Sequence, residues 1–529
     1  MPLLLLSIIL LALLLLLITI SNSKNRKPYC NGNSLPPSSW PCLPLIGNQF
    51  HHYPPTITSL TEALRRLHAA HGPVVSLWVG SKLAIFISCH DLAHRALVHM
   101  GTTFAHRPAS WYRGLNSHCV NSATYGSRWG LLRRNLCSHL GAAHVKDVLR
   151  SSGDRLIKIL ESAAAAAAAG EDGAGAVVAP LETFRHAVFG FFAALCFGQG
   201  VVEEDMLGRL RDLHAEIISL IVELDAFHLL PAFLQVVCYF PRWRKLLSAQ
   251  KRHHLLVTTI IAARRTRREE VVGQDAAEPR CYVDTLLGLE LEELGEDEMV
   301  SLCWEYMNAA VKTTTTALQW IMARLVLHQE IQQKLRNDIA SRRASGDHQQ
   351  RPFVEAVVLE ALRLHPPAHY LLAHTTDKDV SLGKHVIPRG SVVNFGVATI
   401  GRDETSWTDP GVFRPERFME GGEGSGVHCT SGGSSGSETM KMIPFGAGRR
   451  ACPGAAVAMT RCCSRLLRIW SCRRFEWKRA TTGAVVGESV DMTEKLGIIT
   501  EMKVPLQTHL VVRQNSDGSH IYKRTIYGR

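Results

Sequence analysis

Segment 444–454 restricts the possible folds of this chain more than any other, because it places a single cysteine, Cys452, between glycine-containing turns. Gly446 and the other glycines of the segment allow backbone angles and close approaches that a Cβ would block. Pro453 suits the first turn of a helix, where its missing N–H costs nothing. The N-terminus of that helix carries partial positive charge, which favours a thiolate and lowers its pKa, and Arg450 adds a nearby cation. The segment therefore predicts a thiolate held at the start of a helix.

The same segment matches the pattern Phe-x-x-Gly-x-Arg-x-Cys-x-Gly at every fixed position, which are Phe445, Gly448, Arg450, Cys452 and Gly454. A thiolate held in such a loop is one way in which proteins ligate haem iron. The pattern resembles the haem-binding loop of the cytochrome P450 family. The resemblance implies that Cys452 is the axial ligand of the iron of haem b (iron protoporphyrin IX). It also implies that Phe445 packs near the sulfur, that Arg450 lies near a propionate and that Gly446 belongs to the cofactor loop. The alternative is an inert cysteine in a glycine turn.

The composition of the 529-residue chain is that of a globular protein, with a net charge of +12 and 14 cysteines. No basic run is interleaved with aromatic residues, so nucleic acid is not an expected partner. The excess of positive charge suits an anionic membrane surface or an acidic protein. The cysteines follow no zinc or disulfide spacing, which predicts reduced thiols in the cytosol with one of them a ligand.

The N-terminus begins with the uncharged apolar run 3–20, which as a helix would be about 27 Å long and could span a bilayer. The alternative, a cleaved signal peptide, would have a shorter apolar region and a small-residue cleavage site. Lys24, Arg26 and Lys27 follow the run and favour a cytosolic orientation for the rest of the chain. We therefore expect a signal anchor over 1–23 and a basic, proline-rich hinge over 24–48. The resemblance implies an endoplasmic reticulum membrane location, with the catalytic domain facing the cytosol.

Three segments after the hinge have local patterns that predict their structure. Residues 73–88 alternate and are rich in Val, Ile, Leu and Phe, which predicts a β-hairpin around Gly80 and Ser81. Trp129 and Arg133 are spaced i and i+4, on one face of a predicted helix. By resemblance, both side chains bind a haem propionate. The alternative is an amphipathic helix with one arginine that extends to solvent. Further on, residues 205–262 predict apolar helices broken near Pro231 and Pro241.

A long helical stretch is predicted from Glu296 to about Arg343, with four consecutive threonines in its middle. Threonine hydroxyls in a helix can bond to earlier carbonyl groups. The run resembles the oxygen-binding segment of the P450 central helix, and the candidate catalytic residues in it are Lys312, Thr313 and Thr314. Thr313 matches the hydroxyl that bonds the oxygen species. Lys312 stands where the family has an acid thought to deliver protons, and Ala310 replaces a glycine. The alternative is a polar helix face.

Three charged residues downstream are expected to act together. Glu360 and Arg363 are spaced i and i+3, and Arg417 lies in a Pro-Glu-Arg-Phe segment. By resemblance, these residues form a buried charge triad behind the haem. His374 falls where family members have a propionate partner, although a lone histidine is also common without such a role.

The resemblance covers nearly the whole chain after the anchor. It implies a mainly α fold with a small β-rich subdomain, a catalytic domain over 49–514 and a polar tail over 515–529. The implied reaction inserts one atom of O2 into a lipophilic small molecule, with electrons from NADPH through NADPH-cytochrome P450 reductase. The segments near 107–128, 205–245, 366–373 and 496–504 are expected near substrate. Lys312 leaves two alternatives open: a peroxide-rearranging haem-thiolate enzyme, or an impaired, membrane-tethered haem-binding protein.

Overall fold

The computed structural model describes most of the chain beyond the N-terminal segment. The described residues are 34–38, 57–79, 82–108, 119–141, 145, 147–148, 162, 177–225, 232–271, 281–289, 294–345, 352–429, 440–459, 475–479 and 490–512. None of the helices within these ranges has the length and hydropathy of a membrane span. The expected anchor over 1–23 and tail over 515–529 lie outside them.

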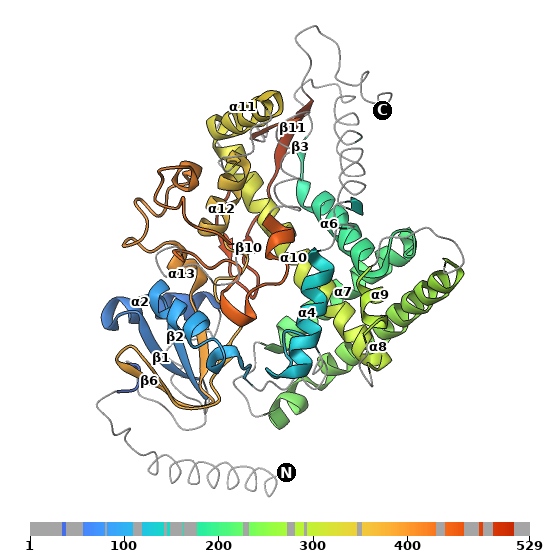
Figure 1. The fold of residues 1–529 in the computed structure, drawn as a ribbon, viewed down its shortest axis with the longest axis horizontal. Coiled ribbons are helices and arrows are strands. Elements are labelled where there is room, and N and C mark those ends of the chain that lie inside the picture. The colour runs from blue at the N-terminus through green and yellow to red at the C-terminus, as the bar shows by residue number, and fades with distance from the viewer. Residues whose placement is uncertain are drawn as a thin grey trace, which may run out of the picture.

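Helices make up most of the described structure, and α10 runs through its middle (Figure 1). The α-helices are α2 (Ile57–His71), α3 (His90–His94), α4 (Ser127–Gly141), α6 (Pro180–Phe197), α7 (Glu204–Asp225), α8 (Ala232–Val271), α9 (Tyr282–Leu287), α10 (Glu296–Leu327), α11 (Gln329–Ser345), α12 (Phe353–Leu364) and α13 (Val397–Gly401). Short helical turns are η2 (Arg95–His99), η3 (Thr103–Ala105), η5 (Pro415–Phe418) and η7 (Gly448–Arg450).

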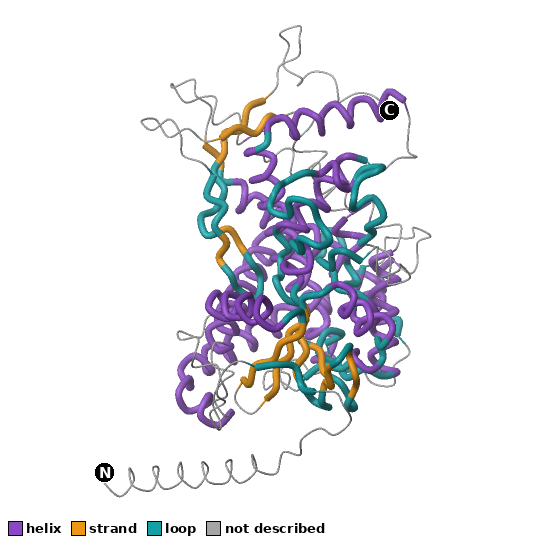
Figure 2. The backbone as a smooth tube through the Cα atoms, turned by 90° about the vertical axis from the view of Figure 1, so that its left-hand side faces the viewer, coloured by secondary structure: helices purple, strands orange, loops and turns teal. Residues whose placement is uncertain are grey.

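The strands form small, separate sheets among the helices (Figure 2). A four-stranded sheet has the order β1 (Val74–Val79), β2 (Lys82–Ile87), β7 (Val392–Phe395) and β4 (His374–Thr375). A three-stranded sheet has the order β3 (Val177–Val178), β11 (Thr508–Val512) and β8 (Phe475–Arg479). Two pairs complete the set: β5 (Val380–Leu382) with β6 (His385–Ile387), and β9 (Glu494–Lys495) with β10 (Glu501–Met502).

The predicted hairpin over 73–88 is confirmed. Strands β1 and β2 are antiparallel and end with Val79 opposite Lys82. Part of the proline-rich hinge is also described, and it packs on this region. Pro36 and Pro37 accept hydrogen bonds from the side chain and the backbone N–H of Ser76, at 2.8 and 2.9 Å. This contact fixes residues 34–38 against β1.

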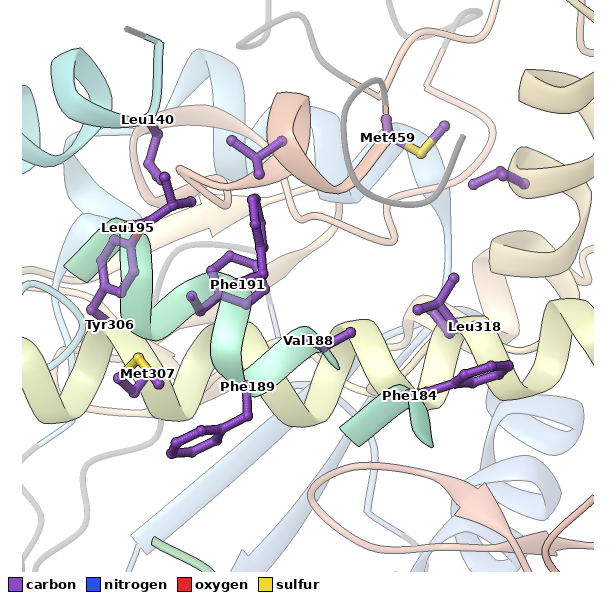
Figure 3. Packing of buried hydrophobic residues seen from close by; sticks show 14 of the residues in the cluster. Leu140, Phe184, Val188, Phe189, Phe191, Leu195, Tyr306, Met307, Leu318 and Met459 are labelled. Carbon is purple, nitrogen blue, oxygen red and sulfur yellow. The ribbon is translucent and has the colours of Figure 1, made fainter. Parts of the chain in front are cut away.

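Helix α10 is the centre of the largest apolar core, where it packs against α6. Figure 3 shows this contact, with Phe184 and Val188 from α6 near Leu318 of α10. Met459, which follows the Cys452 loop, belongs to the same cluster. The core therefore links the central helix to the segment that carries the candidate ligand, and the expected mainly α fold with a small β-rich part is confirmed.

Two expected helix boundaries are wrong. The stretch from Glu296 to Arg343 is not continuous, because His328 adopts φ −112° and ψ 79° between α10 and α11. Gln329 and Gln332 then donate their side-chain amides to the Trp477 carbonyl, which fixes the turn against β8. Pro241 does not break a helix, since it lies inside α8. Packing of α8 against α7, through residues such as Leu246, offsets the hydrogen bond that a proline removes.

Candidate active site

The Cys452 loop is a tight turn that packs directly on another backbone segment. The N–H of Cys452 donates to the Phe445 carbonyl at 2.8 Å. Gly446 and Gly448 have φ of +69° and +67°, in the left-handed region that favours glycine. A Cβ on Gly448 would lie 1.8 Å from the carbonyl oxygen of Leu97, which belongs to η2. Glycine at 448 is therefore required by both conformation and space.

The thiol of Cys452 is an exposed group within a desolvated turn. Burial by the surrounding protein atoms raises its pKa, and a hydrogen bond from the Gly454 N–H and the charge of Arg133 oppose that rise. The expectation of a lowered pKa with Arg450 as the helping cation is therefore wrong for the chain alone. The cation is Arg133, and desolvation outweighs it. Iron would deprotonate a ligating thiol outright, and the Gly454 N–H and Arg133 already favour the anion.

Arg450 connects the Cys452 loop to two other backbone segments through its guanidinium group. Its guanidinium nitrogens donate to the carbonyls of Ala105, Val120 and Ala123 at 2.8, 2.8 and 2.7 Å. The guanidinium carbon also lies 4.6 Å from the centre of the Trp129 ring. Trp129 in turn donates its indole N–H to the Val120 carbonyl at 3.0 Å. Arg450 and Trp129 thus share one acceptor and form a single contact group.

Arg133 and His374 come from two different elements, α4 and β4, and each contacts a backbone carbonyl. The Arg133 guanidinium donates to the carbonyl of Ala451, the residue before the ligand. His374 is buried at the start of β4, and its Nδ1 is 2.7 Å from the Phe104 carbonyl. Burial lowers the pKa of His374 to about 3, and the nearby charge of Arg107 adds to this effect. The Nδ1–H of the neutral ring donates to that carbonyl, and Nε2 is left as an acceptor.

Of the three predicted residues of α10, Thr313 binds α10 itself and Lys312 binds β10. The Thr313 hydroxyl donates to the Ala309 carbonyl at 2.7 Å, as expected for threonine in a helix. Thr314 is buried. The Lys312 ammonium lies 3.3 Å from a carboxylate oxygen of Glu501 in β10. Within the described residues, these three side chains do not join the contact group of Arg450 and Trp129.

The charge triad is present as the sequence pattern implied. Arg363 makes two hydrogen bonds to the Glu360 carboxylate, at 2.7 and 2.9 Å, and Arg417 makes a third at 3.1 Å. All three side chains are 0–1% exposed. Arg363 also donates to the carbonyl of Gly401, so the triad fixes η5 and α13 against α12. Three buried charges can be accommodated here because each of them is hydrogen-bonded.

Sequence reasoning missed two charged residues around segment 119–123. The Glu305 carboxylate of α10 accepts the N–H groups of Val120 and Asn121, at 2.7 and 2.5 Å. Arg107 donates to the carbonyl of Asn121 at 3.2 Å and to that of Leu372 at 2.6 Å. Burial raises the pKa of Glu305 to about 7 despite these N–H groups. Arg107 lay in a segment that the sequence pattern had singled out, but nothing in the pattern distinguished Glu305.

These residues fit a haem held through one thiolate. Among the described residues, no group of three or more histidine, cysteine or acidic side chains could hold a bare metal ion. One exposed thiol with an N–H group directed at its sulfur is the protein ligand that a haem-thiolate centre needs, since the macrocycle supplies the other donors. The fold and this donor define a haem-thiolate oxidoreductase.

The comparisons with known proteins agree with that class. The family model for cytochrome P450 matches residues 37–492. The chain belongs to the cytochrome P450 family and is a monooxygenase. Membership implies haem b as cofactor, O2 as co-substrate and electrons derived from NADPH through a reductase.

Among its relatives, cytochrome P450 89A9 of Arabidopsis thaliana is 34% identical over 91% of this chain and 94% of its own length. Flavonoid 3'-monooxygenase of the same plant is 27% identical over 92% and 93%. A zebra fish cytochrome P450 solved with progesterone has a TM-score of 0.66 at 20% identity, over 85% of this chain and 99% of that one. This last likeness concerns the fold alone.

Proposed function

We propose that the protein inserts one oxygen atom from O2 into a lipophilic small molecule at the endoplasmic reticulum membrane, facing the cytosol. NADPH-cytochrome P450 reductase supplies the electrons, and a signal anchor over 1–23 with a hinge over 24–48 tethers the catalytic domain over 49–514. The observation that carries the proposal is the Cys452 loop, with its exposed thiol, the Gly454 N–H directed at the sulfur and Gly448 seated on the Leu97 carbonyl.

Haem b, when bound, supplies O2 activation, and a thiolate ligand favours O–O cleavage. Cys452 would hold the iron, and Phe445 and Gly446 form the turn that carries this cysteine. Arg133 and His374 would bind the propionates, while Arg450 and Trp129 position the backbone segments around them. All four side chains bind backbone carbonyls, and Arg450 and Trp129 share the carbonyl of Val120. A propionate near His374 would favour its protonated form and restore Nε2 as a donor.

A lipophilic substrate is supported by exposed apolar side chains in two of the segments expected near it. Leu372 is 55% exposed and Ile498 is 47% exposed. The two segments are tied together, because the N–H of Thr500 donates to the Pro367 carbonyl at 2.7 Å. The Trp320 indole of α10 donates to the Thr500 carbonyl at 3.2 Å. Apolar groups held rigidly next to the central helix suit the recognition of an apolar molecule.

The test combines the purified protein with the reductase and a panel made of a flavonoid, a fatty acid, a terpenoid and a pigment catabolite. We expect one class to shift the spin state of the iron and to be oxygenated as NADPH is consumed. Lys312 favours a second candidate, rearrangement of peroxides. Turnover of a lipid hydroperoxide without NADPH consumption would establish that candidate and reject the monooxygenase proposal. If no class is turned over by either route, the protein is the impaired haem-binding form.

A further inference from the structure

The position before Thr313 carries a cation that is paired with a carboxylate from another element. The Lys312 ammonium in α10 is 3.3 Å from Glu501 Oε2 in β10, and these two elements lie side by side (Figure 1). Arg185 of α6 is 3.6 Å from the other oxygen, Oε1. Glu501 therefore lies between two cations that come from two helices.

This arrangement is not explained by stability. The Lys312 side chain is 36% exposed and that of Glu501 is 23% exposed. Ion pairs that remain open to solvent contribute little to folding, because water screens them and both side chains lose freedom. Partial exposure does, however, let the carboxylate exchange protons with solvent.

The reaction itself needs such a group. Each turnover with O2 takes up two electrons and two protons as one oxygen atom becomes water. The protons must travel from solvent to the site, and a carboxylic acid that contacts both solvent and a polar side chain is an effective carrier. The Thr313 hydroxyl donates to the Ala309 carbonyl, so its oxygen lone pairs remain as acceptors for an incoming proton.

We propose that Glu501 is the acid of the proton path to Thr313, and that Lys312 and Arg185 are positioning residues that hold it there. The inference rests on the proposed function. The O–H bond of protonated Glu501 breaks as a bridging water gains the proton, that water releases one of its own protons toward Thr313 and the site, and solvent reprotonates the carboxylate. No electron moves in this step. Lys312 therefore binds an acid from β10, whereas other family members have an acid at this position itself.

The test compares Glu501→Gln with Glu182→Gln in the holoenzyme. Glu182 pairs with the same Arg185 at 2.6 Å but is 76% exposed, so it controls for the loss of a carboxylate beside that arginine. NADPH oxidation is measured with the reductase and dissolved O2 in H2O and in D2O. We expect Glu501→Gln to slow oxidation about fivefold or more and to increase the solvent isotope effect, with Glu182→Gln unchanged. An unaltered rate and isotope effect in Glu501→Gln overturns the proposal.

A second measurement needs no turnover. Melting temperatures of Lys312→Met, Glu501→Gln and the double variant form a cycle that reports the pair itself. We expect the shifts to be non-additive and small. Additive shifts would mean that the two side chains do not interact and would overturn the assignment. If the wild-type protein oxidises no NADPH, both the proposed function and this inference are rejected. If the wild-type protein is active and Glu501→Gln is unaffected, the inference alone is rejected.

Discussion

At the scale of single residues, the two left-handed glycines of the cysteine loop differ in what surrounds them. A Cβ on Gly446 would meet Leu371 at an ordinary 3.6 Å, whereas one on Gly448 would meet the Leu97 carbonyl at 1.8 Å. The φ values are nearly equal, at +69° and +67°, so the conformational strain is the same. Alanine substitutions at these two glycines therefore distinguish the effect of backbone strain from the effect of steric overlap.

We expect Gly446→Ala to lower the free energy of unfolding by about 1–2 kcal/mol through strain alone. Gly448→Ala should cost about 2–5 kcal/mol and reduce haem incorporation, because the overlap with backbone forces η2 and η7 apart. Thermal unfolding and the haem content of the purified variants measure the difference. Equal losses in the two variants would contradict the contact of Gly448 with Leu97.

Glu305 gives the stability of the protein a pH dependence of unusual sign. Its pKa is about 7 when folded and about 4.5 when unfolded, so the folded state binds more protons between these values. Stability from this group is present below about pH 4.5 and is lost as the pH rises through 7. The loss amounts to about 2–3 kcal/mol after allowance for partial exposure.

The test compares Glu305→Gln with the control Glu296→Gln. Glu296 is an exposed residue on the first turn of the same helix, α10. Between pH 5 and pH 8, the stability of Glu305→Gln relative to wild type should increase, because the neutral amide escapes the cost of a buried charge. Glu296→Gln should keep a constant difference. Melting curves over this pH range decide the matter, and a constant difference for Glu305→Gln would show that its carboxyl titrates normally.

At the scale of elements, the segments around the site are joined mainly by side chains that bind backbone carbonyls. Arg450 donates to Ala105, Val120 and Ala123, so one residue of the cysteine loop holds η3 and the segment before α4. Its neighbour Arg449 is exposed and lies 5.7 Å from the Tyr125 ring. The two arginines therefore form a natural comparison.

We expect Arg450→Lys to lower the free energy of unfolding by about 2–4 kcal/mol, because an ammonium cannot reproduce the three-way geometry of the guanidinium. Arg449→Lys should cost less than about 1 kcal/mol. Thermal unfolding of the two holoenzymes checks this. A similar cost for both would mean that the carbonyl contacts of Arg450 do not hold the segments together.

At the scale of the whole molecule, the features that the sequence predicted are those set by the spacing of residues close together in the chain. The hairpin, the helix that carries Trp129 and the pairing of Glu360 with Arg363 depend on short, fixed spacings, and all are present. The break at His328 was missed because its anchor, the Trp477 carbonyl, is distant in sequence. Glu305 and Glu501 were missed for the same reason, since their partners come from segments that only the fold brings near.

The resemblance to the P450 family predicted roles for more residues of the site than local sequence patterns alone could. It predicted roles for Cys452 and the helix segment at 312–314, and it placed Arg450 near a propionate without indicating its carbonyl partners. The omission of these partners has a physical cause. Carbonyls of segments 104–105 and 119–123 have no periodic signature in sequence, so a side chain that binds them cannot be recognised before the chain is folded.

The most direct test of the account is the absorption spectrum of the reduced, CO-bound protein, recorded for wild type, Cys452→Ser and Cys137→Ser. Cys137 is an exposed thiol of α4 close enough to affect the pKa of Cys452, so it is the matched control. We predict a Soret band typical of thiolate ligation in wild type and Cys137→Ser, and its loss in Cys452→Ser. A band typical of histidine ligation in wild type, or a thiolate band that survives Cys452→Ser, would contradict the assignment of Cys452 as the iron ligand.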